Sequence, residues 1–243
     1  MADILSRFNG TILEITFNRP EHGNGATDEM AIEATRLIHE APEGTRGIVL
    51  RGAGNDFCIG RAAKSRPGPG TVEALVMKRG FDAIFNCYAA IRDSPVPVIA
   101  VVQGRALGFG CAVAAVADIT LASDQAQFQV PEMAHNIMPT MVMSAFIGRV
   151  PRKAFNYLVY STVVFSAERA LSYGIVSDVV PAGQLEQALE KTTAMIVSAP
   201  LPAVLGVKEY VRGAFDMPVA GAVDYARNLH AVINSSSEMK KKD

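Results

Sequence analysis

Two glycine-containing segments of the sequence could bring bare backbone against a ligand. Residues 57–61 read Phe-Cys-Ile-Gly-Arg, and residues 104–111 read Gly-Arg-Ala-Leu-Gly-Phe-Gly-Cys. Each follows a predicted strand, and glycine lets another molecule approach the backbone closely because it has no side chain. The second segment lacks the third glycine of a dinucleotide-binding fingerprint, and tight packing of a helix on a strand explains its glycines equally well. Alone, these segments indicate no particular reaction.

Glu132 follows Pro131, and taken alone such a Pro-Glu pair is favoured as a surface N-cap or an ion-pair residue. If Glu132 is buried among Met133, Ile137 and Met141, its pKa should rise, which suits a base that works near neutral pH. His135 either assists or orients Glu132, or is a hydrogen-bonded residue of the wall.

The other histidines and the cysteines do not indicate a metal site. His22 and His39 look like surface residues. His230, near the C-terminus, is an open case: it is as easily placed at the site as away from it. Four dispersed histidines and three scattered cysteines without CxxC spacing predict neither a metal centre nor a disulfide framework. A reducing compartment such as the cytoplasm fits this set of cysteines.

The N-terminal part predicts a hairpin, a helix and a strand, in that order. Residues 4–17 read as two strands around Asn9 and Gly10, a pair that tolerates the positive φ of both central residues of a type I′ turn. Thr27 is the predicted N-cap of a helix, and residues 47–51 form a short buried strand. Apolar residues at helical spacing after Thr27 are Met30, Ala34, Leu37 and Ile38.

The remainder alternates between strands and helices. Residues 65–70 contain two prolines and two glycines and predict a loop beside the site. Helices are predicted over 71–91, 106–117 and 185–196 and again up to about Asn234, and strands over 96–102, 119–122 and 174–181. This pattern predicts an α/β fold, a sheet stacked against helices in one domain.

The motifs in their order resemble the crotonase superfamily, the enoyl-CoA hydratase/isomerase group. The resemblance runs from about residue 10 to residue 215. It rests on residues 18–21 (Asn-Arg-Pro-Glu), 57–60, 97–110, 117–119, 122–123, 128–132 and 167–176.

The resemblance implies a crotonase-like ββα spiral with a helical C-terminal part. Residues 1–185 would form the spiral core, and residues 186–243 would form a helical trimerisation or lid region within the same structural unit. Homotrimers, or hexamers that are dimers of trimers, are the expected assemblies.

The resemblance also implies a site for an acyl-CoA thioester, with coenzyme A entering as part of the substrate and no separate cofactor. The backbone N–H groups of Arg61 and Phe109 would grip the thioester oxygen as it gains negative charge, and Glu132 would move the proton. The implied or candidate contacts to coenzyme A are Lys64, Ile59, Gly60 and Gly108, with Arg19 and Lys208 as weaker candidates. The alternative for Lys64 is a solvated side chain.

The sequence departs from the family's hydratases at two positions. Hydratases use two glutamates, but Ala112 stands where the first is expected, and Thr140 replaces a glycine favoured near the water. Both changes favour an isomerase that shuttles a proton with Glu132 alone.

Two alternatives to an isomerase are open. One is a decarboxylase or C–C bond hydrolase, with Arg61 holding a substrate carboxylate. The other is a non-catalytic scaffold that binds CoA or RNA. The bulk of Arg61 and Phe109 should reshape the pocket, and Phe109 should narrow the acyl channel.

Composition excludes several other classes of function. The chain has 243 residues, 49% of them hydrophobic, and a net charge of −1, so it lacks the broad basic field that nucleic-acid binding needs. No Gly-x-Ser-x-Gly elbow of a serine hydrolase occurs. The start has no signal-like layout, the most apolar stretch, 96–123, is interrupted by polar residues, and 240–242 is a run of lysines expected to be solvated. We expect a soluble, cytoplasmic protein that contacts no membrane.

Overall fold

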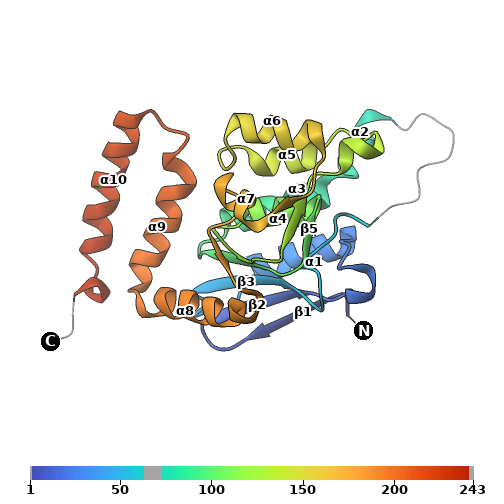
Figure 1. The fold of residues 1–243 in the computed structure, drawn as a ribbon. Coiled ribbons are helices and arrows are strands. Elements are labelled where there is room, and N and C mark those ends of the chain that lie inside the picture. The colour runs from blue at the N-terminus through green and yellow to red at the C-terminus, as the bar shows by residue number, and fades with distance from the viewer. Residues whose placement is uncertain (1, 63–72, 241–243) are drawn as a thin grey trace.

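The computed structural model describes residues 2–62 and 73–240 of the chain. The predicted loop at 65–70 and the candidate CoA contact Lys64 lie outside the described residues. A six-stranded sheet, in the order β1-β2-β3-β4-β6-β9, forms the centre of the molecule (Figure 1). Its strands are β1 (Ile4–Phe8), β2 (Ile12–Phe17), β3 (Gly47–Gly52), β4 (Val98–Val102), β6 (Ile119–Ser123) and β9 (Asp178–Val180).

The N-terminal hairpin is confirmed, but its predicted turn type is wrong. β1 and β2 pair antiparallel, with Phe8 opposite Leu13. Only Gly10 has a positive φ, +93°, whereas a type I′ turn needs positive φ at Asn9 too. The Asn9 side chain instead accepts hydrogen bonds at Oδ1 from the N–H groups of Thr11, at 3.1 Å, and Ile12, at 2.8 Å. A local side-chain bond therefore closes this turn.

Strands β2, β3, β4, β6 and β9 are parallel, and both faces of the sheet are covered. Along β3, Ile48 and Leu50 belong to the main core, whereas Val49 belongs to a second cluster with Leu185 and Leu189. Two buried faces explain why these strands are continuous apolar runs.

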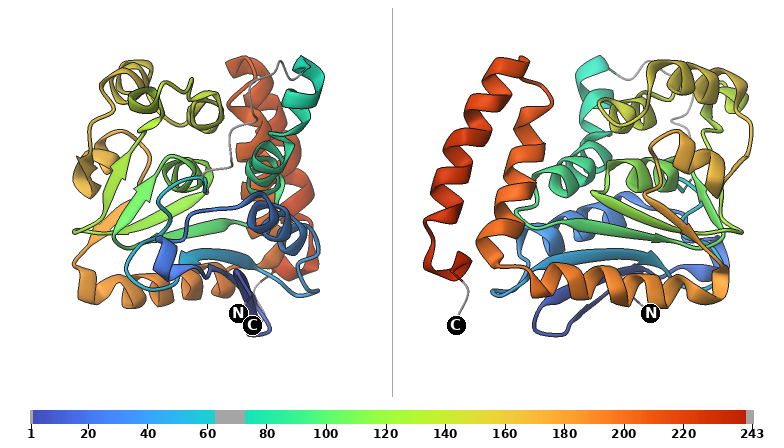
Figure 2. Two further views of the ribbon diagram at one scale, coloured as in Figure 1. Left: turned by 90° about the vertical axis from the view of Figure 1, so that its right-hand side faces the viewer. Right: turned by 60° about the vertical axis from the view of Figure 1, so that its left-hand side comes forward.

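Helices from distant parts of the sequence form the two outer layers. The face with Ile48 carries α1 (Asp28–His39), α3 (Asp82–Asp93) and α4 (Phe109–Val116), and the opposite face carries α8 (Leu185–Ser198). Figure 2 shows α8 running along the lower side of the sheet. The predicted cap of α1 is confirmed, because Thr27 Oγ1 accepts a hydrogen bond from Met30 N at 3.2 Å.

A second sheet of three short strands was not predicted. It consists of β5 (Arg105–Leu107), β7 (Gln127–Gln129) and β8 (Phe165–Ser166), with β7 in the middle. The predicted helix over 106–117 is therefore wrong at its start, because strand β5 runs to Leu107 and α4 begins only at Phe109. Gly108 lies between them, and its φ of +48° and ψ of −110° make a break in the regular structure. This break places the start of α4 beside the second sheet.

Two other predicted elements are shorter than expected. In place of one helix over 71–91 the structure has α2 (Ala74–Arg79) and α3, separated at Gly80 and Phe81. Within 174–181 only β9 is a strand. The remaining helices around the core are α5 (Thr140–Phe146), α6 (Arg152–Ser161) and α7 (Ala167–Ser172), and short 3-10 turns include one at Glu132–His135.

The last two helices, α9 (Leu201–Ala214) and α10 (Val219–Asn234), pack side by side and project from one side of the sheet (Figures 1 and 2). Lys208 on α9 is almost fully buried, and its Nζ donates to Asp118 Oδ2 at 2.6 Å and to the Ile91 carbonyl oxygen at 3.1 Å. The weaker prediction that Lys208 contacts CoA is therefore wrong, because this ammonium group joins α9 to the core.

No single helix in the described part of the chain is long and apolar enough to cross a membrane. Residues 182–198 and 201–214 reach that length only as a pair that is bent by 106°.

Candidate active site

A cavity of about 610 Å³ lies where α3, the start of α4, α5 and the segment after β7 meet. Most of the site residues predicted from the sequence line it, namely Ile59, Gly60, Arg61, Gly108, Phe109, Glu132 and His135. The rest of its wall is largely apolar and includes Ile84, Met141 and Val142. The cavity therefore combines a few polar groups with an apolar lining, as small-molecule sites do.

Backbone hydrogen bonds hold the two glycine segments side by side. The Cys58 N–H donates to the carbonyl oxygen of Arg105 at 3.1 Å, and the Leu107 N–H donates to that of Cys58 at 2.9 Å. A Cβ atom built on Gly110 would lie 2.1 Å from the Cys58 carbonyl oxygen, so only glycine fits there. Both interpretations of the glycines apply: Gly110 permits tight packing, and Gly60 and Gly108 border the cavity.

Two backbone N–H groups on the cavity wall have no acceptor among the described residues. They belong to Arg61, which follows Gly60 at φ +116°, and to Phe109, the first residue of α4. The N–H groups in the first turn of a helix have no partner within the helix and carry its positive dipole end. The wall therefore offers donors where an oxygen atom of a ligand could bind.

The side chains of Arg61 and Phe109 are held by contacts with other residues of the protein. Arg61 Nη2 lies 2.6 Å from Asp28 Oδ1 and donates to the Gly80 carbonyl oxygen at 3.2 Å, and the guanidinium lies 5.9 Å from the centre of the Phe81 ring. This ion pair removes the basis for the idea that Arg61 holds a substrate carboxylate.

The Phe109 ring is only 3% exposed and belongs to the aromatic core. It stacks on Tyr88, with the ring centroids 5.6 Å apart, and meets Phe17 edge-on at 6.2 Å. The expectation that the Phe109 ring itself narrows an open channel is therefore wrong, because its neighbours hold it inside the core.

The Glu132 carboxylate sits directly against the start of α4. A Cβ atom on Gly108 would lie 2.7 Å from Glu132 Oε1, so a side chain at Gly108 would displace the carboxylate. Glu132 Oε2 is buried and has no hydrogen-bond partner among the described residues.

Burial is the main influence on the acidity of Glu132. It raises the pKa above the ordinary value of 4.5, while a hydrogen bond from the backbone of Glu132 itself and, to a lesser extent, the electrostatic interaction with His135 oppose the rise. The predicted direction is confirmed, and Ile137 and Met141 line the cavity as expected, but Met133 is exposed. Such a carboxylate is more basic than one in water.

Glu132 is the only carboxylate among the described residues that line the cavity. Ala112 is fully buried within α4 and is not part of the wall, and Thr140 is exposed and also lies outside it. The described wall therefore offers one proton-transferring carboxylate rather than two.

Other candidate residues lie away from this cavity. Arg19 forms an ion pair with Asp3 at 3.6 Å and donates from Nη1 to the Gly25 carbonyl oxygen at 3.1 Å. His230 is exposed on α10, where it meets Asn234 at 3.2 Å. No group of three or more potential metal ligands occurs in the described chain.

Sequence reasoning missed the contribution of α3 to the site. Ile84 and Tyr88 come from this helix, and Phe81 comes from the break before it. The available signal was the spacing of Ile84, Tyr88 and Ile91, which puts one hydroxyl on an otherwise apolar helix face.

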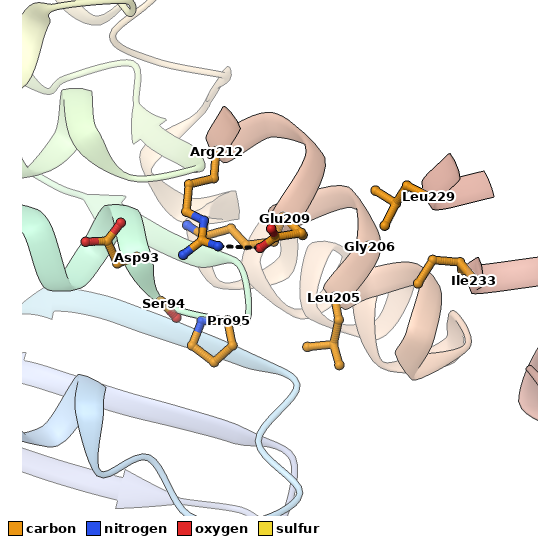
Figure 3. Close-up of a pocket in the computed structure, with 10 residues that line it drawn as sticks. Asp93, Ser94, Pro95, Leu205, Gly206, Glu209, Arg212, Leu229 and Ile233 are labelled. Carbon is orange, nitrogen blue, oxygen red and sulfur yellow. Dashed lines mark hydrogen bonds and ion pairs between the residues drawn. The ribbon is translucent and has the colours of Figure 1, made fainter. Parts of the chain in front are cut away.

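A second cavity, of about 370 Å³, lies where the α9–α10 pair meets the segment after α3 (Figure 3). Asp93 and Pro95 line its core side, and Glu209 and Arg212, an ion pair at 2.5 Å, line its α9 side. Apart from Lys208, whose ammonium group is used internally, it contains none of the predicted site residues.

Comparisons with known proteins identify the family. The sequence profile of the enoyl-CoA hydratase/isomerase family matches residues 7–242. Carnitinyl-CoA dehydratase from Salmonella typhi is 32% identical over 227 residues, which cover 90% of this chain and 84% of that protein.

Solved structures agree on the fold. Enoyl-CoA hydratase from Mycobacterium smegmatis has a TM-score of 0.90 at 24% identity and covers 98% of this chain and 93% of its own. A putative enoyl-CoA hydratase from Thermobifida fusca YX in complex with CoA has a TM-score of 0.86 at 24% identity, and the match covers 95% of this chain and 92% of that one. The predicted crotonase-like α/β fold is confirmed, and the chain belongs to the enoyl-CoA hydratase/isomerase family of enzymes, within the crotonase superfamily.

Proposed function

We propose that this chain isomerises enoyl-CoA thioesters, with Glu132 as the single group that removes and returns the proton. The observation that carries the proposal is the solitary, largely buried carboxylate of Glu132 in one cavity with the unpaired N–H groups of Arg61 and Phe109. Coenzyme A would enter as part of the substrate, and no other cofactor is needed.

The backbone donors would stabilise the enolate. Removal of a proton from C2 of a 3-enoyl thioester moves negative charge onto the thioester oxygen. The fixed N–H groups of Arg61 and Phe109 would donate hydrogen bonds to that oxygen without reorganising, and the N-terminal end of α4 favours negative charge. The apolar wall strengthens these interactions because it excludes water.

One carboxylate suffices for the proton balance of isomerisation. Glu132 takes the proton from C2, the double bond moves into conjugation with the carbonyl group, and the same carboxyl returns the proton at C4. The raised pKa of Glu132 brings its basicity closer to what transfer near neutral pH requires. Nothing is consumed, so no second acid is needed.

Reversible dehydration of a hydroxyacyl-CoA is the second candidate, because relatives with about one third identity are named carnitinyl-CoA dehydratase. That reaction also needs a group that protonates the departing hydroxyl or orients the water. Ala112 cannot supply one, so Glu132 would have to serve both steps. Isomerisation is therefore the better fit to the described site.

Assembly and location follow the family expectation. We propose a homotrimer or a dimer of trimers in the cytoplasm. Exposed apolar side chains on the projecting pair of helices support association, among them Val219, 81% exposed, and Val232, 66% exposed.

The test compares wild type, Glu132→Gln and the exposed control Glu190→Gln on a 3-enoyl-CoA and on the matching 3-hydroxyacyl-CoA. The absorbance of the conjugated product reports turnover, and deuterium from D₂O reports exchange at C2 and C4. We expect turnover of the 3-enoyl-CoA to fall by about 100-fold or more in Glu132→Gln and to stay unchanged in the control.

Two outcomes would contradict the proposal. Unchanged turnover in Glu132→Gln would exclude the proton shuttle, and turnover of the hydroxyacyl-CoA alone would replace isomerisation by dehydration.

A further inference from the structure

Tyr88 is one of the few polar residues that line the largely apolar cavity of Glu132. It lies on α3, is only 1% exposed, and lines the same cavity as Glu132. Its ring stacks on Phe109, whose backbone N–H is one of the proposed donors, with an angle of 22° between the ring planes. The ring is therefore held in one orientation by the aromatic core.

No hydrogen bond joins the Tyr88 hydroxyl to another described residue. The groups that act on it electrostatically are Cys58, Cys87, Cys111 and Glu132. A buried tyrosine hydroxyl usually has a hydrogen-bond partner. Glu132 Oε2, on the same cavity wall, is also unpaired. Two polar groups without partners on one cavity wall indicate that a bound molecule supplies their hydrogen-bond partners.

The Tyr88 hydroxyl can act only as a donor or neutral acceptor. Burial, and to a lesser extent the nearby thiols and Glu132, raise the pKa of Tyr88 well above its ordinary value of 10.0. It keeps its proton at neutral pH and cannot replace Glu132 as the base. It can donate a hydrogen bond to an acceptor on a ligand.

We propose that Tyr88 is a specificity-determining residue that donates a hydrogen bond to an oxygen atom carried by the acyl chain, so that the enzyme prefers oxygen-bearing acyl-CoA thioesters over plain alkyl ones. This inference rests on the proposed function, since it assigns the acyl end of that substrate to this cavity. An alkyl chain would fill the apolar wall of Ile84, Met141 and Val142 but would leave the hydroxyl buried and unpaired. A site built to bond a polar group rejects the analogue that lacks it more strongly than an apolar site rejects an added hydroxyl.

The experiment uses two 3-enoyl-CoA thioesters of equal chain length, one alkyl and one with a hydroxyl or keto group near the distal end. Wild type, Tyr88→Phe and the control Tyr225→Phe are compared by kcat/KM for each thioester. Tyr225 lies on α10, outside the cavity, where its hydroxyl bonds Glu209 Oε1 at 3.0 Å. We expect Tyr88→Phe to lower kcat/KM for the oxygen-bearing thioester by about 10- to 100-fold and to leave the alkyl thioester unchanged or improved.

An equal loss on both thioesters would overturn the proposal, because it would assign the hydroxyl to the thioester group or to a water molecule common to both. Equal kcat/KM of wild type for the two thioesters would overturn it as well. Thermal unfolding checks the variant, which removes no hydrogen bond of the described protein and should not lower Tm.

A binding measurement separates this inference from the proposed reaction. Calorimetry with the two saturated acyl-CoA analogues needs no turnover, and we expect wild type to bind the oxygen-bearing analogue more tightly and Tyr88→Phe to lose that preference. If Glu132→Gln keeps full turnover, the proposed reaction is contradicted. The binding preference assigned to Tyr88 is still decided separately, by the calorimetry of wild type and Tyr88→Phe.

Discussion

At the scale of single residues, the site depends on one carboxylate whose surroundings make it basic. Glu132 is partly buried against Gly108, and burial raises its pKa above 4.5. A base must be ionised to act, so its activity is lost as the pH falls through its pKa. We therefore expect the acidic limb of the pH profile of kcat/KM to lie above pH 4.5.

His135 should tune that limb. Its positive charge lowers the pKa of Glu132, so removing the charge should raise that pKa further. In His135→Gln we expect the acidic limb to move to higher pH, measured from kcat/KM across the acidic range. His39→Gln, an exposed change at the end of α1, is the control. A limb that stays in place or moves to lower pH would show that His135 does not act on Glu132.

At the scale of elements, the start of α4 is fixed by its close approach to the segment after β3. The Gly110 Cα packs against the Cys58 backbone so tightly that any side chain would overlap the Cys58 carbonyl oxygen. This contact also sets the separation of the two proposed N–H donors, since Arg61 follows Cys58 by three residues and Phe109 precedes Gly110.

Gly110→Ala should therefore destabilise the protein strongly. The added Cβ would lie 2.1 Å from a backbone oxygen, and backbone cannot move aside as a flexible side chain can. We expect the free energy of unfolding, measured by urea denaturation, to fall by about 3 kcal/mol or more. Gly183→Ala is the matched control, because no heavy atom lies within 4 Å of its Cβ position, and it should change stability by less than about 0.5 kcal/mol.

At the scale of the whole molecule, a buried ion pair holds the projecting helices to the core. Lys208 on α9 pairs with Asp118, whose Oδ2 also accepts from Val98 N at 2.8 Å at the start of β4. Burial lowers the pKa of Lys208, while Asp118 opposes that change. Asp118 thus has a structural role at the corner between α4 and β6.

Lys208→Met should weaken this attachment. It leaves the Asp118 carboxylate without its cation, and breaking one side of a buried pair typically costs about 3–5 kcal/mol. The double variant Lys208→Met/Asp118→Asn should recover part of the loss, since it removes the unpaired charge while an amide oxygen can still accept from Val98 N. Urea denaturation of Lys208→Met, Asp118→Asn and the double variant gives the coupling energy of the pair, and strictly additive losses of stability would contradict the coupling.

Local physics was enough to predict several elements from the sequence. The Asn9-Gly10 hairpin, the Thr27 cap of α1 and the apolar parallel strands each depend on neighbouring residues, through turn chemistry, capping and periodicity. The family motifs also pointed to Glu132 and to the two backbone donors beside it, and all of them line one cavity.

What only the tertiary structure decided depends on residues that are far apart in the sequence. The strands of the second sheet are two or three residues long and exist because they pair with one another, so no local pattern marks them. The commitment of Arg61 to Asp28 and the placement of Tyr88 over Phe109 arise from packing between α1, α3 and α4. The sequence by itself determined the family and pointed to Glu132, whereas the folded chain decided which side chains are held by other residues of the protein and which line the cavity.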